Sequence, residues 1–160
     1  MESPVMAACI SPTERHAALA PAPPGSLAII PPKQFAYTIL YVQDVARSIA
    51  FYEAAFGLQR RFVHDGGDYG ELETGATTLA FSSHQLMAQL GKNPRRASAD
   101  APSFEIALTT DDVPAALARA VAAGARQVRA PEKMPWGQTI AYVEDGDGVL
   151  VELCTPVRPA

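Results

Sequence analysis

The sequence contains few of the residues that build metal clusters, disulfide frameworks or histidine-based iron sites. Its 160 residues include two cysteines and three histidines. Cys9 lies near the N-terminus and Cys154 near the C-terminus, so the sequence has no CxxC pair and predicts neither a disulfide framework nor a zinc site. Free thiols are typical of cytoplasmic proteins, and we expect that location for this chain.

Long apolar runs and clusters of basic residues are absent as well. No stretch of the sequence approaches the roughly 20 apolar residues of a membrane span, so we expect no membrane partner. The 13 basic residues are outnumbered by 17 acidic ones, which gives a net charge of -4. Because phosphate contacts need clustered Lys and Arg, we expect no nucleic-acid partner. The pairs Arg60-Arg61 and Arg95-Arg96 are interpreted as solvated surface charge.

Proline and alanine are concentrated in residues 1–33, where Pro21, Pro23, Pro24, Pro31 and Pro32 lie close together. Proline removes a backbone donor and holds its neighbours in extended conformations. This composition predicts an extended or disordered N-terminal extension over residues 1–33, followed by a folded domain over residues 34–157.

The folded part carries one pattern twice. Asp44 and Asp112 each follow a strand-like run and precede an apolar helical stripe, which makes both residues helix caps. They are separated by 112 − 44, or 68 residues. Three strand-like runs separated by turn signals follow each helix. The strands expected are residues 35–42, 58–64, 69–73 and 77–82 in the first unit, and residues 103–110, 127–130, 139–143 and 149–154 in the second. A short helix at 84–90 and a polar linker join the units.

Two groups of residues resemble the motifs of a known superfamily. Residues 42–52 (VQDVARSIAFY), with Phe56-Gly57-Leu58, are similar to the opening motif of vicinal-oxygen-chelate proteins, which include glyoxalases, bleomycin-resistance proteins and extradiol dioxygenases. Residues 135–138, 144–148 and 151–153 resemble the closing motif. The resemblance implies an α+β fold in which two βαβββ modules, residues 34–83 and 103–157, form an open U-shaped barrel around a cleft. It also implies a homodimer.

The resemblance further implies where a metal would be held. Metal-using members take one ligand from the first strand and one from the last strand of each module, and these positions fall on Tyr37, Ala80, Glu105 and Glu152. Alanine cannot coordinate, and a neutral tyrosine is a poor ligand for a divalent ion. Because two carboxylates alone make a weak site, we expect no conventional metal site and no cofactor.

Alternation of side chains along each strand predicts which residues face the cleft. Phe104, Ile106 and Leu108 are expected to pack on the helices. The apolar stripe of the second helix is expected to consist of Val113, Leu117, Ala120 and Val121. The residues expected to bind ligand are Tyr37, Ile39, Tyr41, Thr78, Ala80, Ser82 and Trp136, and the residues expected to act in catalysis are Glu105 and Glu152.

Three functions stay open at this point. The first is a small-molecule-binding protein that holds a planar or cationic ligand in an acidic, aromatic cleft without a metal, as antibiotic-sequestering members of the superfamily do. The second is a glyoxalase-like lyase or isomerase, which uses a metal at Glu105 and Glu152 or uses one of them as a base. The third is a structural or regulatory dimer with a vestigial cleft.

Overall fold

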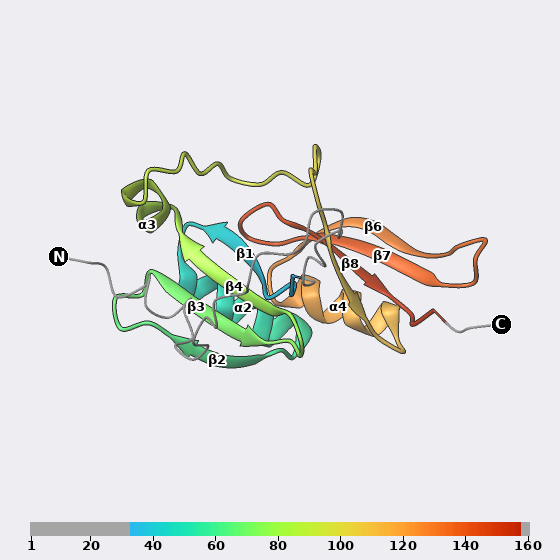
Figure 1. The fold of residues 1–160 in the computed structure, drawn as a ribbon. Helices are drawn as coiled ribbons and strands as arrows, with labels where there is room; N and C mark the ends of the chain where they lie inside the picture. Colours follow the sequence, from blue (N-terminus) through green and yellow to red (C-terminus); the bar gives the residue numbers. More distant parts are fainter. Residues whose placement is uncertain (1–32, 158–160) are drawn as a thin grey trace, which may run out of the picture. The chain divides into compact units, whose positions relative to one another are not determined.

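The helices and strands follow one another in the order that the sequence predicts (Figure 1). A computed structural model describes residues 33–157, so the extension expected at residues 1–33 lies, except for Lys33, outside the described residues. The first module consists of β1 (Tyr37–Val42), α2 (Val45–Phe56), β2 (Gln59–Val63), β3 (Tyr69–Glu73) and β4 (Thr78–Ser83). The second consists of β5 (Ile106–Thr109), α4 (Val113–Ala122), β6 (Arg126–Lys133), β7 (Thr139–Glu144) and β8 (Leu150–Cys154), and α3 (His84–Gln89) lies between the modules in the chain.

Local signals set the ends of the two long helices. The carboxylate of Asp44 accepts a hydrogen bond from the backbone N–H of Arg47 at 3.0 Å, and Asp112 does the same for Ala115 at 3.0 Å. Both caps satisfy a backbone donor that the first turn leaves without an intrahelical partner. At the end of α2, Gly57 adopts φ +71°, a left-handed conformation that glycine reaches without strain.

Each module builds a four-stranded mixed sheet with the same topology. The strand order is β1-β4-β3-β2 in the first sheet and β5-β8-β7-β6 in the second. The parallel strand pairs β1–β4 and β5–β8 also have corresponding registers. Ile39 lies opposite Ala80 in the first pair, and Ala107 lies opposite Glu152 in the second. The repeat expected from the sequence, including the equivalence of positions 80 and 152, is therefore confirmed in the strand register.

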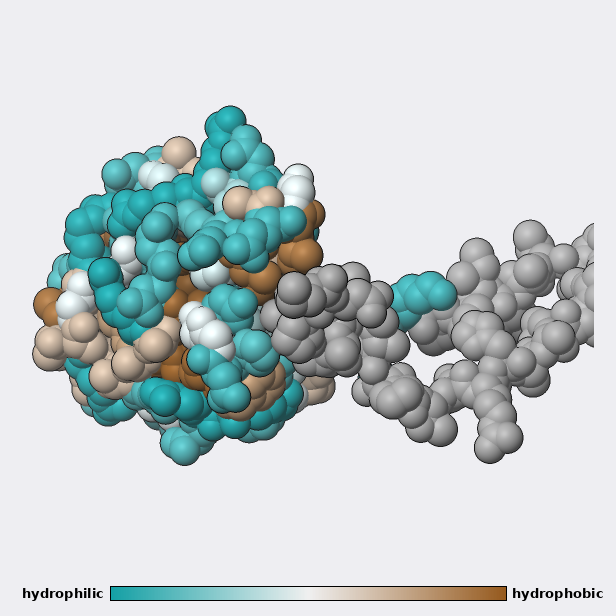
Figure 2. Space-filling view, turned by 90° about the vertical axis from the view of Figure 1, so that its left-hand side faces the viewer, coloured by the Kyte–Doolittle hydropathy of each residue, from teal (hydrophilic) through white to brown (hydrophobic). Residues whose placement is uncertain are grey.

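One helix covers one face of each sheet, α2 on the first and α4 on the second. Alternate strand residues such as Leu40 and Phe81 pack beneath α2 together with its buried Ile49 and Tyr52. α2 and α4 also contact each other, and one apolar cluster contains residues of both modules. In the described part of the chain, no helix has the length and apolar character needed to cross a membrane. Viewed from the end that carries the first sheet and α3, the surface is mostly hydrophilic with smaller apolar areas (Figure 2).

The turn between β7 and β8 joins the second module to α2 through buried polar groups. The hydroxyl of Tyr52 donates to Asp145 Oδ2 at 3.0 Å, and the hydroxyl of Ser48 donates to Asp147 Oδ2 at 2.7 Å. The backbone N–H of Gln43 donates to Asp147 Oδ1 at 3.0 Å. We call this group of bonds the intermodule clasp. The sequence predicts the hairpin turn, and the structure adds its contacts with the first module.

Some expectations about packing are wrong. Phe104 was expected against the helices but is 49% exposed, because β5 begins only at Ile106 and residues 103–105 precede it. Val121 is 42% exposed because Val113, Leu117 and Ala120 already complete the buried stripe of α4. β6 is longer than expected, since the strand runs from Arg126 to Lys133.

Candidate functional site

The face of the first sheet that points away from α2 carries the predicted ligand-binding residues of the first module. We call it the first-module face. In the β1–β4 register its residues form three cross-strand pairs: Tyr37 with Thr78, Ile39 with Ala80, and Tyr41 with Ser82. Thr78, Ala80 and Ser82 are buried, whereas Ile39 is 40% exposed. The accessible part of these pairs therefore belongs to β1. There Lys92 donates to the Tyr41 hydroxyl at 2.9 Å, with its ammonium 5.2 Å from the ring centre.

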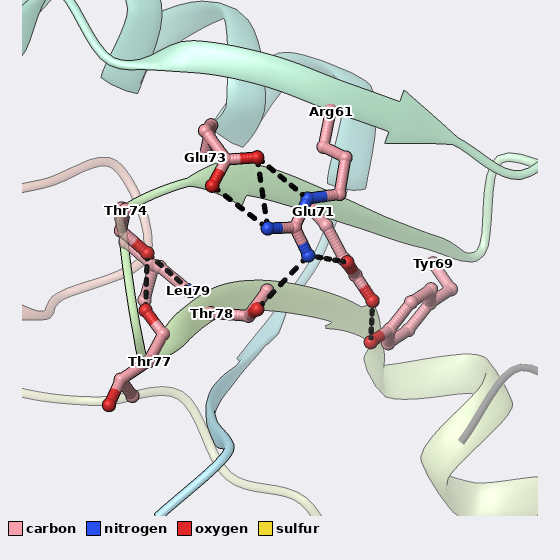
Figure 3. Close-up of polar contacts among 8 residues, drawn as sticks. All are labelled: Arg61, Tyr69, Glu71, Glu73, Thr74, Thr77, Thr78 and Leu79. Atoms are coloured by element: carbon pink, nitrogen blue, oxygen red, sulfur yellow. Dashed lines mark hydrogen bonds and ion pairs between the residues drawn. The ribbon is translucent and has the colours of Figure 1, made fainter. Parts of the chain in front are cut away.

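The first-module face also carries a buried carboxylate with its own cation (Figure 3). Arg61 donates from Nη1 to Glu71 Oε2 and to the hydroxyl of Thr78, both at 3.1 Å. Its Nε and Nη2 bind the two oxygens of Glu73 at 3.0 and 2.9 Å, and the hydrogen bond to Glu73 is the main reason that the pKa of Arg61 is raised. Tyr69 donates to Glu71 Oε1 at 2.9 Å. A buried carboxylate needs such partners because its lost hydration is costly.

Sequence reasoning missed this network because it treated Arg60 and Arg61 alike. Arg60 does pair with Glu53 on α2 at 2.7 Å, as expected for surface charge. In the β2–β3 register Gln59 lies opposite Glu73 and Arg60 opposite Leu72, so the alternation of side chains puts Arg61 on the same face as Glu71. The sequence offered one signal of this network: Glu71 is a charged residue within an expected strand, between Gly70 and Leu72, and a charge there needs a partner.

The second sheet carries the two predicted catalytic carboxylates. Glu152 on β8 lies between Ala107 on β5 and Tyr142 on β7 in the strand register, and the Tyr142 hydroxyl donates to Glu152 Oε2 at 2.6 Å. Glu105 stands just before β5 and is exposed. We call the group formed by Glu105, Tyr142, Glu152 and Cys154 the second-module face.

The charges of the second-module face affect one another. Desolvation and then the charge of Glu152 raise the pKa of Glu105. Desolvation, the hydrogen bond to Glu152 and both carboxylate charges raise the pKa of Tyr142. The pKa of the Cys154 thiol rises to about 11, mainly through burial and then through Glu152. The structure therefore brings Glu105 and Glu152 close enough to interact.

The residues of the second-module face do not form a conventional divalent-metal site with those of the first. Ala80 offers only a methyl group, and its neighbour Glu71 is already bound by Arg61 and Tyr69. Within residues 33–157 no group of three or more His, Cys, Asp or Glu side chains is placed to hold a metal ion. Two glutamates do not supply the number of oxygen ligands that hard cations take, or the imidazoles that softer ones prefer.

Residues of both modules line several cavities, and Trp136 lies at a different one. Thr78 of β4 and Ala107 of β5 line one of about 260 Å³, and Thr78 is the one residue predicted to bind ligand or act in catalysis that lines it. Trp136 lies in the turn between β6 and β7 and lines a cavity together with Asp111 and Lys133. None of the other residues predicted to bind ligand or act in catalysis lines the cavity at Trp136.

Comparison with known proteins agrees with this architecture. The family model described as Glyoxalase/Bleomycin resistance protein/Dioxygenase superfamily matches residues 34–153, and the chain belongs to this superfamily. The α+β fold of two βαβββ modules expected from the resemblance is confirmed by the sheets described above and by solved structures.

A glyoxalase-related enzyme from Fulvimarina pelagi is 25% identical, with a TM-score of 0.68, over 78% of this chain and 88% of that chain. A family enzyme from Burkholderia phytofirmans is 20% identical, with a TM-score of 0.64, over 79% of this chain and 100% of that chain. A family protein from Nocardioides is 17% identical, with a TM-score of 0.66, over 83% of this chain and 89% of that chain. The comparison with curated proteins gave no match.

Proposed function

We propose that this chain is a small-molecule-binding protein of the glyoxalase/bleomycin-resistance type. It holds a planar or cationic ligand against an acidic and aromatic surface, without a conventional metal site. The observation that carries the proposal is the pair Glu105 and Glu152, whose charges interact while neither has an ion-pair partner among the described residues.

The two faces differ in how their carboxylates are compensated. On the first-module face, Arg61 binds Glu71. On the second-module face, Tyr142 donates a hydrogen bond to Glu152, and the nearby cation Arg129 pairs with Glu132 instead. Two like charges in proximity raise each other's free energy, and a bound cation relieves that repulsion. The phenol rings of Tyr37 and Tyr142 supply aromatic surface of the kind that attracts organic cations.

The cavity between the modules supports one shared site. Of the first-module-face residues its lining includes only Thr78, and it approaches the second-module face at Ala107, the β5 neighbour of Glu152. We therefore place the ligand between the first-module and second-module faces, with Tyr37, Ile39, Tyr41, Thr78, Ala80 and Ser82 on one side and Glu105 and Glu152 on the other.

The proposal is tested with two planar probes that share a ring system, the cation proflavine and the neutral base acridine. Glu105→Gln and Glu152→Gln are each expected to weaken proflavine binding about five-fold, which corresponds to about 1 kcal/mol for one charge-assisted contact, and to leave acridine binding unchanged. Glu53→Gln on α2 removes the same charge on the other side of the first sheet and serves as the control. If both site variants bind proflavine as tightly as Glu53→Gln does, the acidic pair is not the cation site.

A lyase or isomerase of the glyoxalase type is the second candidate. The raised pKa of Glu105 favours it, because a carboxyl group that binds a proton more readily suits proton transfer. In the version that uses a metal, Glu105 and Glu152 would hold the ion. Metal analysis of dialysed protein separates the candidates: a stoichiometric divalent ion that Glu105→Gln and Glu152→Gln remove supports the metal-dependent enzyme, and its appearance would overturn the metal-free binding proposal.

We also propose that the protein forms a homodimer, as the family resemblance implies. Size-exclusion chromatography with light scattering should give twice the 17.0 kDa mass of one chain. A single 17.0 kDa species at micromolar concentration would contradict it.

A further inference from the structure

The cavity at the β6–β7 turn has the size and the walls of a ligand site. Its volume is about 650 Å³, within the range of roughly 300–1,000 Å³ that small-molecule sites occupy. Its lining combines an aromatic ring, two charged side chains and two threonines, which are Trp136, Asp111, Lys133, Thr139 and Thr155. The cavity is therefore both apolar and polar, as specific ligand sites are.

The indole ring of Trp136 is exposed but held in place. Its side chain is 64% exposed, and its Nε1–H donates to Gln138 Oε1 at 2.8 Å. The amide of Gln138 in turn donates to the carbonyl of Thr155 at 2.6 Å. The backbone N–H of Met134 donates to the Gln138 carbonyl at 2.7 Å and closes the turn. An exposed ring fixed through such a chain loses little conformational freedom when a second ring stacks on it.

The two charges of this cavity are unpaired. Among the described residues, the side chains of Lys133 and Asp111 have neither a hydrogen bond nor an ion pair, although both residues line the same cavity. Other cations near the sheets are engaged: Lys92 binds Tyr41, and Arg126 binds Asp100 and Glu144. One positive and one negative side chain beside a fixed ring make a complementary surface for a ligand with an aromatic ring and both charges.

We propose that this cavity is a second ligand site, specific for small aromatic zwitterions of the amino-acid class. The ligand's ring stacks on Trp136, its carboxylate contacts Lys133 and its ammonium group contacts Asp111. This site goes beyond the cation site proposed above and shares no charged residue with it. Because stacking and exposed ion pairs each contribute little to the binding free energy, we expect the zwitterion to bind with a dissociation constant in the millimolar range.

Trp136 is the single tryptophan of the chain, so tryptophan fluorescence reports on this site alone. The probes are L-phenylalanine, phenethylamine and 3-phenylpropanoate, which share one ring and carry both charges, only the ammonium, or only the carboxylate. L-Phenylalanine is expected to change the emission saturably, and each singly charged probe should bind about three-fold more weakly. The indole N–H resonance in an NMR titration gives a second measure of the same binding.

Two exposed substitutions test the assignment of each charge. Lys133→Gln should remove the preference for L-phenylalanine over phenethylamine, and Asp111→Asn should remove the preference over 3-phenylpropanoate. Glu53→Gln and Lys92→Gln are controls that should leave all three titrations unchanged. The proposal is overturned if no probe saturates, if the three probes bind equally, or if the preferences survive both substitutions. An emission that depends on protein concentration instead would show that a second copy of the chain covers Trp136, which also overturns it.

Discussion

Replacing Tyr52 by phenylalanine isolates one bond of the intermodule clasp. The substitution keeps the ring, which packs edge-to-face against Phe51, Phe56 and Phe81, and removes only the hydroxyl that donates to Asp145. Tyr52 is fully buried and Asp145 is 5% exposed, so water cannot replace the lost donor. Hydrogen bonds to charged groups contribute roughly 1.5–3 kcal/mol, and we expect Tyr52→Phe to lower the free energy of unfolding by about 2 kcal/mol.

The assay is urea denaturation followed by circular dichroism. Tyr41→Phe is the matched control, because it removes a hydroxyl bonded to Lys92 at a partly exposed position and should cost less than about 1 kcal/mol. A double-mutant cycle of Tyr52→Phe with Asp145→Asn should show coupling above about 0.5 kcal/mol. A loss for Tyr52→Phe no larger than that of Tyr41→Phe, or additive effects in the cycle, would refute the view that this bond holds the modules together.

Three further predictions concern other parts of the molecule. Desolvation raises the pKa of Asp145 above its usual 3.8, so the folded state binds this proton more tightly than the unfolded chain. As the pH falls from 7 through this raised pKa, the free energy of unfolding of the wild type should therefore rise relative to that of Asp145→Asn. If urea denaturation gives the same difference between the two proteins across that pH range, the assignment is contradicted. Arg61→Gln leaves the buried Glu71 carboxylate without its cation, so it should be less stable than the double variant with Glu71→Gln; the reverse order of thermal midpoints would be inconsistent with the pairing. At pH 7, a pKa of about 11 leaves on the order of one Cys154 thiol in ten thousand as thiolate, and a Cys9→Ser protein should react with a chromogenic disulfide far more slowly than free cysteine does.

The order of the elements could be predicted from the sequence because each element is specified locally. The apolar spacing of α2, its cap at Asp44 and the glycine at position 57 all agree with one another. The 68-residue offset between Asp44 and Asp112 identifies the repeat, and the strand register confirms that offset at Ile39 and Ala107, which lie opposite Ala80 and Glu152. When the local signals agree with the overall fold in this way, the order of the elements can be predicted from the sequence.

The contacts that could not be predicted from the sequence depend on how distant parts of the chain pair and pack. Arg61 reaches Glu71 because β2 pairs with β3 in the register that sets Arg60 opposite Leu72, and the sequence does not specify that register. Asp145 is buried because the turn that carries it meets α2 of the other module, 93 residues away at Tyr52. The apolar alternation of Phe104, Ile106 and Leu108 indicates a strand that includes Phe104, but β5 begins only at Ile106.

A crystal structure of the proflavine complex tests the proposed cation site most directly. We expect the ring of the dye beside Tyr142 and one of its amino groups within hydrogen-bonding distance of Glu105 or Glu152. A dye bound only on Trp136, or a divalent ion held by the two glutamates in its place, would contradict the proposal.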